Sequence, residues 1–271
     1  MTRHSARRNV QCHSSPPAPA FSRTLGSTEQ ADLAFAVCKP VLIEQNRKTI
    51  QTGSCSFLLL GGEHFLITAR HVLESHGSGP YFVGTRQGRF YLDRSHYKSS
   101  LCPQRDDKHD IAIYPLNDED LEKLQGTGFI TRDMVCTTTF PESPALVIGY
   151  PNSKNKKIPP GSPARVEVHG IATQTLSVPT ETARRYGTGN EANFFVHYGR
   201  EDKKAPQLMS PTGMSGGIVM IQLGGKALVA GIPIEYHKNM NFILCTHYNL
   251  VCNSVERLIG NPERPDKAKP A

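Results

Sequence analysis

The sequence predicts an all-β protein with two consecutive sets of antiparallel strands. Its 271 residues include 23 Gly and 20 Pro, a composition that favours many turns between short strands over long helices. Apolar residues occur mainly in short runs bounded by turn residues. A hydrophobic fraction of 38% is enough for a core, and β domains often exceed ~200 residues. One large β domain therefore accounts for the chain.

The folded domain is predicted to span residues 28–259. Residues 1–27 combine Arg, Ser and a Pro-rich stretch, which cannot bury enough apolar surface to offset the entropy lost on ordering. A disordered basic tail is therefore expected there. Ser27 is a candidate N-cap for a short helix that Pro40 ends. Residues 260–271 are predicted to be a loose polar tail.

The first set of strands is expected within residues 28–135. Gly61 and Gly62 separate two apolar runs, which predicts a hairpin of two buried strands. Residues 117–125 are acidic and predict a short helix or turn. The predicted strands of this first barrel are residues 41–43, 56–60, 65–68, 81–84, 89–92 and 110–114.

The second set of strands is expected within residues 136–246. Apolar residues at roughly helical spacing over 247–259 predict a C-terminal helix that packs on this second barrel. No sequence repeat relates the two halves. The predicted strands of the second barrel are residues 145–149, 164–169, 194–198, 217–222, 227–234 and 242–245.

The net charge of +7 does not predict a nucleic-acid interface. Residues 1–23 hold four Arg and no acidic residue, and residues 151–170 carry a further net charge of +3. These two segments account for the whole excess, so no basic stripe remains elsewhere. A solvated tail and a solvated loop explain the charge, and no nucleic-acid partner is expected. The sequence leaves the oligomeric state open.

Cysteine usage and the N-terminus predict a soluble cytoplasmic protein. The seven Cys residues are odd in number and irregularly spaced, so we expect reduced, mostly buried thiols. The N-terminus lacks the apolar core of a secretory signal, and no apolar run has the length of a membrane span.

Three segments together predict a nucleophilic catalytic site. His71 follows an apolar run, Asp110 opens another, and Ser215 lies in residues 213–217, Gly-Met-Ser-Gly-Gly in sequence. A serine hydroxyl needs a neighbouring imidazole to accept its proton and a carboxylate to fix the tautomer of that imidazole. We assign these roles to Ser215, His71 and Asp110. Each segment alone is commonplace, but the three together are specific.

The small residues around Ser215 also predict an oxyanion site. Acyl transfer develops a negative charge on the attacked carbonyl oxygen, which converging backbone N–H groups stabilise. The expected donors are the N–H groups of Gly213 and Ser215. A side chain at position 213 is expected to damage the reaction.

Other acids and histidines were weighed for these roles. Asp106 and Asp107 compete with Asp110, but only Asp110 directly precedes an apolar strand. His96, Cys102 and His109 match no compact zinc motif, so we expect no metal and no cofactor. His197 lies in a predicted apolar strand, where it either contacts the substrate or belongs to the core or surface of the barrel. The sequence favours the core or barrel surface.

On these residues the chain resembles the chymotrypsin-like (trypsin-fold) serine peptidases, especially compact bacterial forms, over roughly residues 30–258. The matching segments are residues 68–71, 110–112 and 213–217, and residues 148–151 resemble a turn at the start of the second barrel. The resemblance implies two six-stranded antiparallel β-barrels with the active site in the cleft between them. It also implies a protein or peptide substrate.

Two departures from the resemblance narrow its meaning. Met214 stands where secreted relatives carry an Asp that receives a new N-terminal amine, so activation by N-terminal insertion is not expected. Met209 stands where trypsin carries the acid that binds Arg or Lys. Together with Gly231, Ile232 and Pro233, it is predicted to form a substrate pocket for a small or aliphatic side chain.

The leading hypothesis is a serine endopeptidase that acts through an acyl-enzyme on Ser215. The alternative is a catalytically silent binding or regulatory module with the same fold. A third reading, nucleic-acid binding by residues 1–27, predicts salt-dependent association that deletion of the tail abolishes.

Overall fold

The computed structural model describes the folded part of the chain. The described residues are 32, 36–46, 48–74, 79–85, 88–93, 95–99, 109–138, 142–155, 166–176, 192–199 and 209–260. The predicted tails at 1–27 and 260–271 lie outside them except for Gly260, which ends the C-terminal helix, and most of the predicted helix before Pro40 also lies outside them.

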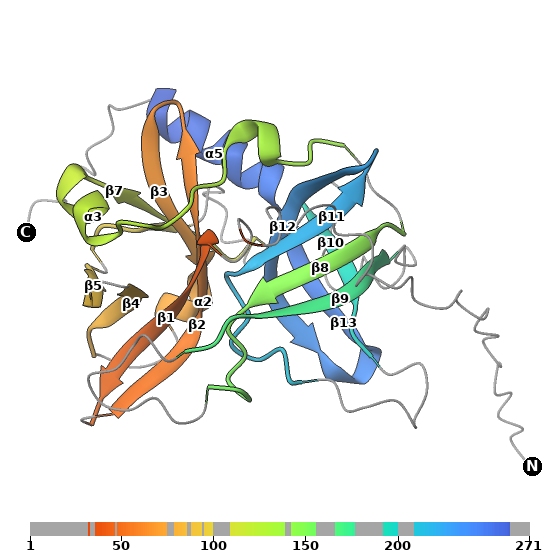
Figure 1. The fold of residues 1–271 in the computed structure, drawn as a ribbon, viewed down its shortest axis with the longest axis horizontal. Coiled ribbons are helices and arrows are strands. Elements are labelled where there is room, and N and C mark those ends of the chain that lie inside the picture. The colour runs from red at the N-terminus through yellow and green to blue at the C-terminus, as the bar shows by residue number, and fades with distance from the viewer. Residues whose placement is uncertain are drawn as a thin grey trace, which may run out of the picture.

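The first half is an antiparallel sheet in the order β5-β4-β1-β2-β3-β7-β6 (Figure 1). Six of its strands have five or more residues, as expected, and a two-residue strand adds a seventh. Its strands are β1 (Cys38–Gln45), β2 (Lys48–Leu60), β3 (Glu63–Ala69), β4 (Tyr81–Thr85), β5 (Gly88–Leu92), β6 (Lys98–Ser99) and β7 (Ile111–Leu116).

β2 is much longer than the sequence pattern indicated. It begins at Lys48, whereas the prediction placed its start at residue 56. The added segment buries polar side chains, among them Gln51, Thr52 and Ser54. A stretch that buries polar groups lacks the apolar alternation by which strands are found in a sequence.

The second half is a closed barrel in the order β10-β13-β12-β11-β8-β9. The strand predicted at residues 164–169 differs from the structure, because residues 166–168 lie outside any strand, with Val166 and Val168 packed against the core, and a strand begins only at His169. Residues 164 and 165 lie outside the described part of the chain. The adjoining strand instead pairs with β8 and β10. The strands are β8 (Pro144–Gly149), β9 (His169–Leu176), β10 (Asn193–His197), β11 (Ile218–Leu223), β12 (Lys226–His237) and β13 (Phe242–His247).

Three α-helices lie in the described part of the chain. α2 (Arg70–Glu74) follows β3, and α3 (Asp118–Lys123) begins with a reciprocal capping box between Asn117 and Asp120. The predicted C-terminal helix is confirmed as α5 (Tyr248–Gly260), which packs against β12, β13 and β2. Tyr248 is fully buried, and its hydroxyl lies 3.3 Å from Ser56 Oγ of β2. α5 therefore ties the two halves together.

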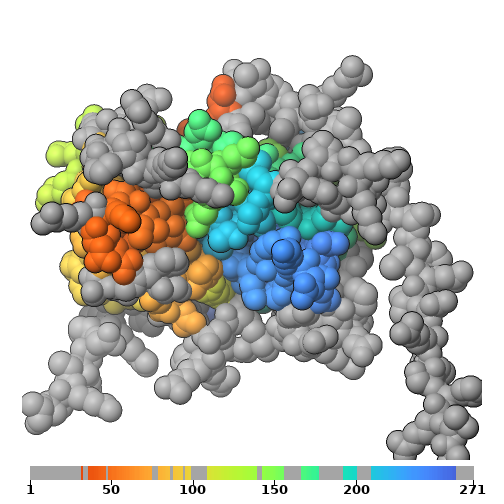
Figure 2. All heavy atoms as spheres, turned by 90° about the horizontal axis from the view of Figure 1, so that it is seen from below, coloured from red at the N-terminus to blue at the C-terminus, as the bar shows by residue number. Residues whose placement is uncertain are grey.

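The two halves share one large apolar core. Its cluster includes Phe57 of β2, Ile148 of β8 and Tyr248 of α5, all without exposed surface. The two halves lie against each other in the space-filling view, with residues near 150 at their junction (Figure 2). The predicted all-β fold with two strand systems and a C-terminal helix is confirmed.

The described cysteines belong to this interior. Cys38, Cys55, Cys136, Cys245 and Cys252 are free and buried. Burial raises the pKa of the Cys38 thiol to about 12. No helix among the described residues is long and apolar enough to cross a membrane.

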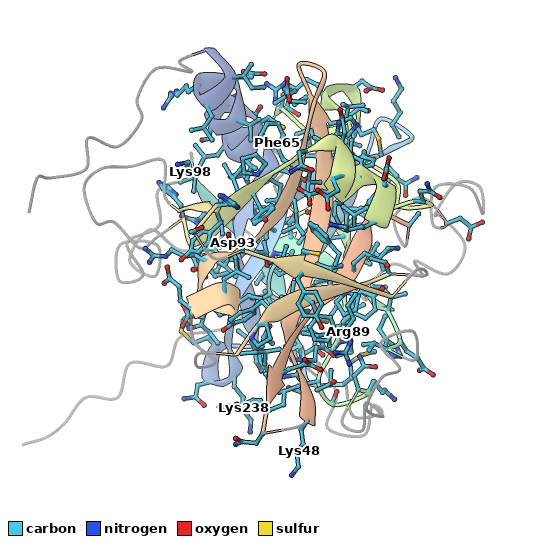
Figure 3. The ribbon with its side chains drawn as sticks, turned by 90° about the vertical axis from the view of Figure 1, so that its left-hand side faces the viewer. Lys48, Phe65, Arg89, Asp93, Lys98 and Lys238 are labelled. Carbon is cyan, nitrogen blue, oxygen red and sulfur yellow. The ribbon has the colours of Figure 1, made fainter. Side chains whose placement is uncertain are left out.

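Charged side chains occupy the outer edges. On the β5 side of the first sheet, Arg89 pairs with Glu44 and lies 4.8 Å from the Phe82 ring centroid. Arg89 and Asp93 belong to this side of the molecule, while Lys48 and Lys238 project at one end (Figure 3).

Candidate active site

His71 is held at the end of β3 by the short helix α2. Val72 and Leu73 are buried and anchor the helix, whereas the His71 side chain remains 39% exposed. The N–H of Arg70 donates to the Asp110 carbonyl oxygen at 2.9 Å, which joins the start of α2 to the turn before β7. The imidazole is therefore accessible but fixed at its base.

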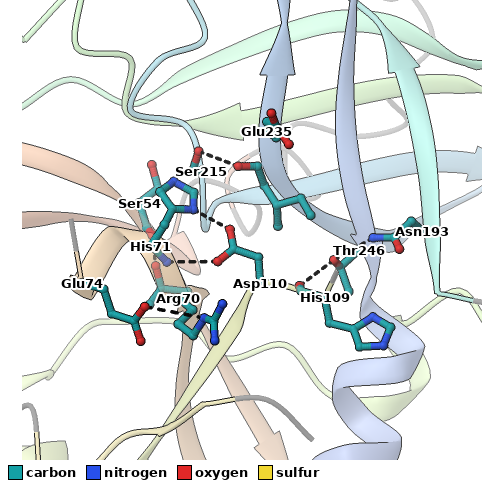
Figure 4. Close-up of polar contacts among 12 residues, drawn as sticks. Ser54, Arg70, His71, Glu74, His109, Asp110, Asn193, Ser215, Glu235 and Thr246 are labelled. Carbon is teal, nitrogen blue, oxygen red and sulfur yellow. Dashed lines mark hydrogen bonds and ion pairs between the residues drawn. The ribbon is translucent and has the colours of Figure 1, made fainter. Parts of the chain in front are cut away.

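Asp110 binds His71 through both carboxylate oxygens. Oδ1 accepts the backbone N–H of His71 at 3.0 Å, and Oδ2 lies 2.5 Å from its Nδ1 (Figure 4). A carboxylate can only accept, so Nδ1 carries the proton and Nε2 faces outward without it when the ring is neutral. This is the tautomer that a general base needs. Asp106 and Asp107 lie outside the described residues.

The second barrel supports the turn that carries Asp110. Thr246 of β13 donates its hydroxyl to the His109 carbonyl oxygen at 2.8 Å, and Asn193 Nδ2 donates to that hydroxyl at 3.2 Å (Figure 4). Asp110 itself has φ +42°, a left-handed conformation. Contacts from both halves therefore define the position of the carboxylate.

The Ser215 loop lies directly against the end of β3. Gly216 has φ +85°, and a Cβ there would come within 2.3 Å of Thr68 Oγ1 and 3.0 Å of the Ala69 N. The N–H of Ser54 also donates to the Ser215 carbonyl oxygen at 2.8 Å. Since Ala69 is two residues before His71, the fold brings the nucleophile segment beside the histidine segment.

The Ser215 side chain does not bond to His71. Within the described residues its hydroxyl donates to the carbonyl oxygen of Ile234, at 3.3 Å. Ile234 lies at a bulge in β12, where the pairing with β13 shifts between Pro233 and Glu235. The bulge directs the Ile234 carbonyl group toward the serine. Because a hydroxyl has only one proton to donate, this bond must break before Ser215 can donate to His71.

Two backbone N–H groups of the loop remain available for an oxyanion. Among the described residues, no acceptor bonds the N–H of Gly213 or Ser215, whereas those of Met214, Gly216 and Gly217 are all bonded. The carbonyl group in each of the two peptide units is held from behind. Asn152 N–H donates to the Thr212 oxygen at 2.7 Å, and Gly217 N–H donates to the Met214 oxygen at 2.9 Å. Because C=O and N–H point in opposite directions across a trans peptide, the free N–H groups face away from these partners.

The predicted pocket residues are divided between the surface and the barrel interior. Gly231 and Ile232 are buried in the wall of the barrel, where a Cβ on Gly231 would strike the Phe194 ring. Their role in a substrate pocket stays a prediction. Met209 is partly exposed, and the Pro233 carbonyl oxygen accepts the Gly216 N–H at 2.9 Å.

An aromatic pair lies beside Met209. The Tyr198 hydroxyl donates to the Met209 carbonyl oxygen, and the Tyr198 ring packs edge-on against Tyr236 with centroids 5.2 Å apart. Tyr236 is two residues beyond Ile234, whose carbonyl group contacts Ser215. Sequence reasoning missed both tyrosines, because nothing in the linear pattern distinguishes them from core aromatics.

Sequence reasoning also missed the contribution of β2. A Cβ on Gly53 would come within 2.4 Å of Val72 and 3.0 Å of the Ser215 carbonyl oxygen. Only glycine allows β2 to run between α2 and the Ser215 loop. The adjoining Gln51 and Ser54 side chains bond to the backbone of that loop. A Gly flanked by small polar residues inside a strand was the available signal.

The other titratable residues do not gather at one point. His96 lies 3.4 Å from Asp93, and the His109 carbonyl group contacts Thr246, while Cys102 is outside the described residues. His197 is partly buried in β10. No three His, Cys, Asp or Glu side chains of the described part could together hold a metal ion.

Solved structures similar to this chain include serine proteases and an inactivated protease paralogue. A thermostable serine protease, AL20, from an extremophilic microorganism matches with a TM-score of 0.53 and 13% identity, over 84% of this chain and 99% of that one. The Rv3671c protease of M. tuberculosis in its active form matches with a TM-score of 0.51 and 14% identity, over 92% and 93% of the two chains. The scabies mite inactivated protease paralogue S-I1 gives 0.53 and 15%, over 84% and 95%. No protein-family model and no curated protein matches the sequence.

These likenesses define the fold. The chain has the chymotrypsin fold of the trypsin-like serine peptidases, as its sequence motifs indicated. At 13–15% identity these structures share only their fold with this chain. One of them is described as an inactivated protease paralogue, so the fold alone does not imply activity. The activity must be argued from the site.

Proposed function

We propose that this protein is a serine endopeptidase that cleaves peptide bonds through an acyl-enzyme on Ser215. His71 takes the proton of the Ser215 hydroxyl and then delivers it to the leaving amine. Asp110 orients the ring and stabilises its charged form. The observation that carries the proposal is the contact of Asp110 with both the ring and the backbone N–H of His71.

The oxyanion donors support the same reaction. The tetrahedral intermediate places a negative charge on the former carbonyl oxygen. In the Ser215 loop, the N–H groups of Gly213 and Ser215 have no hydrogen-bond acceptor among the described residues, so they can bind this oxygen. Ser215 attacks after its hydroxyl leaves the Ile234 carbonyl oxygen. A substrate strand that competes for this carbonyl group would favour the change.

The substrate pocket favours a small or aliphatic side chain before the cleaved bond. Met209 offers no negative charge for Arg or Lys, and the Tyr198–Tyr236 pair fills space beside it. The buried, free thiols also support the expectation of a reducing, cytoplasmic location.

A fluorophosphonate probe tests the activity without knowledge of the substrate. We expect the wild-type protein to be labelled, Ser215→Ala to lose labelling by about 10⁴-fold or more, and Ser95→Ala to match wild type. Ser95 is a matched serine control, since it lies at the outer edge of the first sheet and bonds Asp93. A folded wild-type protein that neither reacts with the probe nor cleaves a broad peptide library contradicts the proposal.

A specific observation favours one alternative function. The Ser215 hydroxyl donates to the Ile234 carbonyl oxygen and not to His71, which is compatible with a binding or regulatory module of the same fold. Such a module binds peptides in the cleft without turnover. Fluorescence anisotropy with a labelled peptide library, followed by mass spectrometry of the bound peptides, distinguishes capture from cleavage.

A further inference from the structure

Two buried side chains of β2 connect the first sheet to the Ser215 loop. Ser54 Oγ donates to the Gly213 carbonyl oxygen at 2.9 Å and accepts the N–H of Tyr150 at 2.9 Å. Gln51 Nε2 donates to the carbonyl oxygen of Tyr150 and, at 3.4 Å, to that of Gly213. We call Gln51 and Ser54 the β2 latch.

Burial makes these bonds specific. Gln51 is 4% exposed and Ser54 is 0% exposed, so neither side chain can turn to water instead. An unpaired buried polar group typically costs about 1–3 kcal/mol. The latch side chains bond to the backbone of Tyr150 and Gly213. The free-energy cost of burying these polar groups is therefore offset only while that backbone keeps its position.

The latch acts on the peptide units around Gly213. Gly213 has φ +95°, and a glycine there could rotate its flanking peptide groups freely. The latch fixes the Gly213 carbonyl group, and Met214 N–H of the same peptide unit donates to Pro211 at 2.9 Å. The preceding peptide unit is fixed by the Asn152 N–H, which donates to the Thr212 carbonyl oxygen. Asn152 lies two residues after Tyr150, to which the latch also bonds. Both units are thereby set with the Gly213 N–H unbonded.

Among the described residues, no charged side chain performs this task in the loop. Met214, the residue before the nucleophile, is 1% exposed and packs in the apolar cluster of the second barrel. An acid at this position could have anchored the loop by an ion pair, and an apolar side chain cannot. The neutral bonds from β2 are the polar side-chain bonds to the Gly213 carbonyl group among the described residues.

We propose that Gln51 and Ser54 are positioning residues that hold the Ser215 loop in the conformation that binds the oxyanion. The proposal rests on the proposed peptidase function, because it assigns the latch to the same reaction. It makes the first sheet contribute to the nucleophile half of the site as well as to the base half. The latch does not touch the substrate.

Removal of each latch bond tests the proposal. We expect Ser54→Ala to lower the rate of fluorophosphonate labelling by about 10- to 100-fold and Gln51→Met by about 3- to 30-fold, since loosened oxyanion donors cost less than a donor removed outright. The pH dependence of labelling should keep its midpoint, because His71 and Asp110 are unaltered. For any peptide substrate found, kcat should fall with KM nearly unchanged.

Thr52→Val is the matched control. Thr52 lies between the latch residues on β2 and is 5% exposed, and its hydroxyl donates to Val41 rather than to the loop. We expect this variant to lose a similar free energy of unfolding while its labelling rate stays within about twofold of wild type. If both latch variants behave like Thr52→Val at matched stability, the latch is merely structural and the inference fails.

Hydrogen–deuterium exchange keeps the latch testable apart from activity. The N–H groups of Met214 and Gly216 are hydrogen-bonded and should exchange about tenfold faster in Ser54→Ala and Gln51→Met than in Thr52→Val. Unchanged exchange overturns the latch. A wild-type protein that is never labelled overturns the peptidase function alone, and the exchange data still decide whether the latch orders the loop.

Discussion

The base half and the nucleophile half of the site are held in place by different means. His71 and Asp110 both lie at the edge of the first sheet and contact each other through a short carboxylate–imidazole bond and a backbone bond. Ser215 lies on a glycine-rich loop of the second half, and its position depends on neutral bonds from residues of the other half. Both halves of the site therefore depend on the packing of the two strand systems, since Thr246 of the second barrel supports the turn that carries Asp110. The base half has in addition its own direct bonds between Asp110 and His71, whereas the nucleophile half relies on bonds from β2 to the backbone of its loop.

The largest effect should follow from a change in the base half. Asp110→Asn is expected to lower labelling and peptide cleavage by about 10⁴-fold, because an amide nitrogen facing Nδ1 stabilises the tautomer in which Nε2 carries the proton. Asn tolerates the left-handed conformation at φ +42°, so the turn should be preserved.

The measurement is kcat/KM together with the melting temperature. Asp120→Asn on the exposed α3 helix is a matched control that should leave activity unchanged. Full activity in Asp110→Asn would show that another group orients His71.

The next effect should come from the nucleophile half. Gly213→Ala is expected to lower kcat by about 100- to 1,000-fold, as expected for the loss of an oxyanion donor. A Cβ at this position would come within 2.1 Å of Asn152 Oδ1 and 2.7 Å of the Tyr150 carbonyl oxygen, so the loop must shift.

Kinetics with a peptide ester and the probe measure this loss. Gly224→Ala is the control, since Gly224 also has positive φ but a Cβ there meets nothing within 4 Å. Equal rates in Gly213→Ala and Gly224→Ala would show that catalysis does not depend on the conformation of the loop at Gly213.

A smaller effect is expected on specificity. Tyr236→Ala should open the space beside Met209 and raise reaction with a phosphonate probe bearing a Phe side chain by about tenfold or more, with little change for an Ala probe. Tyr91→Ala, at a 49% exposed position of the first sheet, should alter neither rate. Unchanged selectivity in Tyr236→Ala would show that the substrate pocket does not lie beside the Tyr198–Tyr236 pair.

The smallest effect concerns the pH dependence of the free energy of unfolding, through Cys38 at the interface between the two halves. The Cys38 thiol lies 4.0 Å from the carbonyl oxygen of Ile148, and burial raises its pKa to about 12. A thiol with a raised pKa in the folded state stabilises that state fully below its ordinary pKa of 9.0, and this contribution is lost as pH rises toward 12.

Urea unfolding at pH 8 to 11 measures this dependence. The free energy of unfolding of wild type should fall more steeply with pH than that of Cys38→Ala, by on the order of 1 kcal/mol per pH unit above 9. Parallel slopes for the two proteins would indicate that Cys38 ionises equally well in both states.

Much of the strand content could be predicted because apolar runs and turn residues are local signals. Residues 81–84 and 145–149 are short apolar runs that became β4 and β8, and the acidic segment after Asn117 became α3. Prediction failed where burial is polar, as in the first eight residues of β2. It also failed near Val168, where an apolar residue packs against the core without joining the sheet.

The sequence by itself determined the candidate chemistry. His71, Asp110 and Ser215 stand out in the linear pattern because each role requires one residue type, and Gly213 because small residues around the nucleophile let backbone N–H groups converge on an oxyanion. Tertiary structure decided what holds these groups. The bond of Ser215 to Ile234, the Tyr198–Tyr236 pair and the β2 latch join residues far apart in the chain. Such contacts leave no local pattern, because they form only when the two halves fold and pack together.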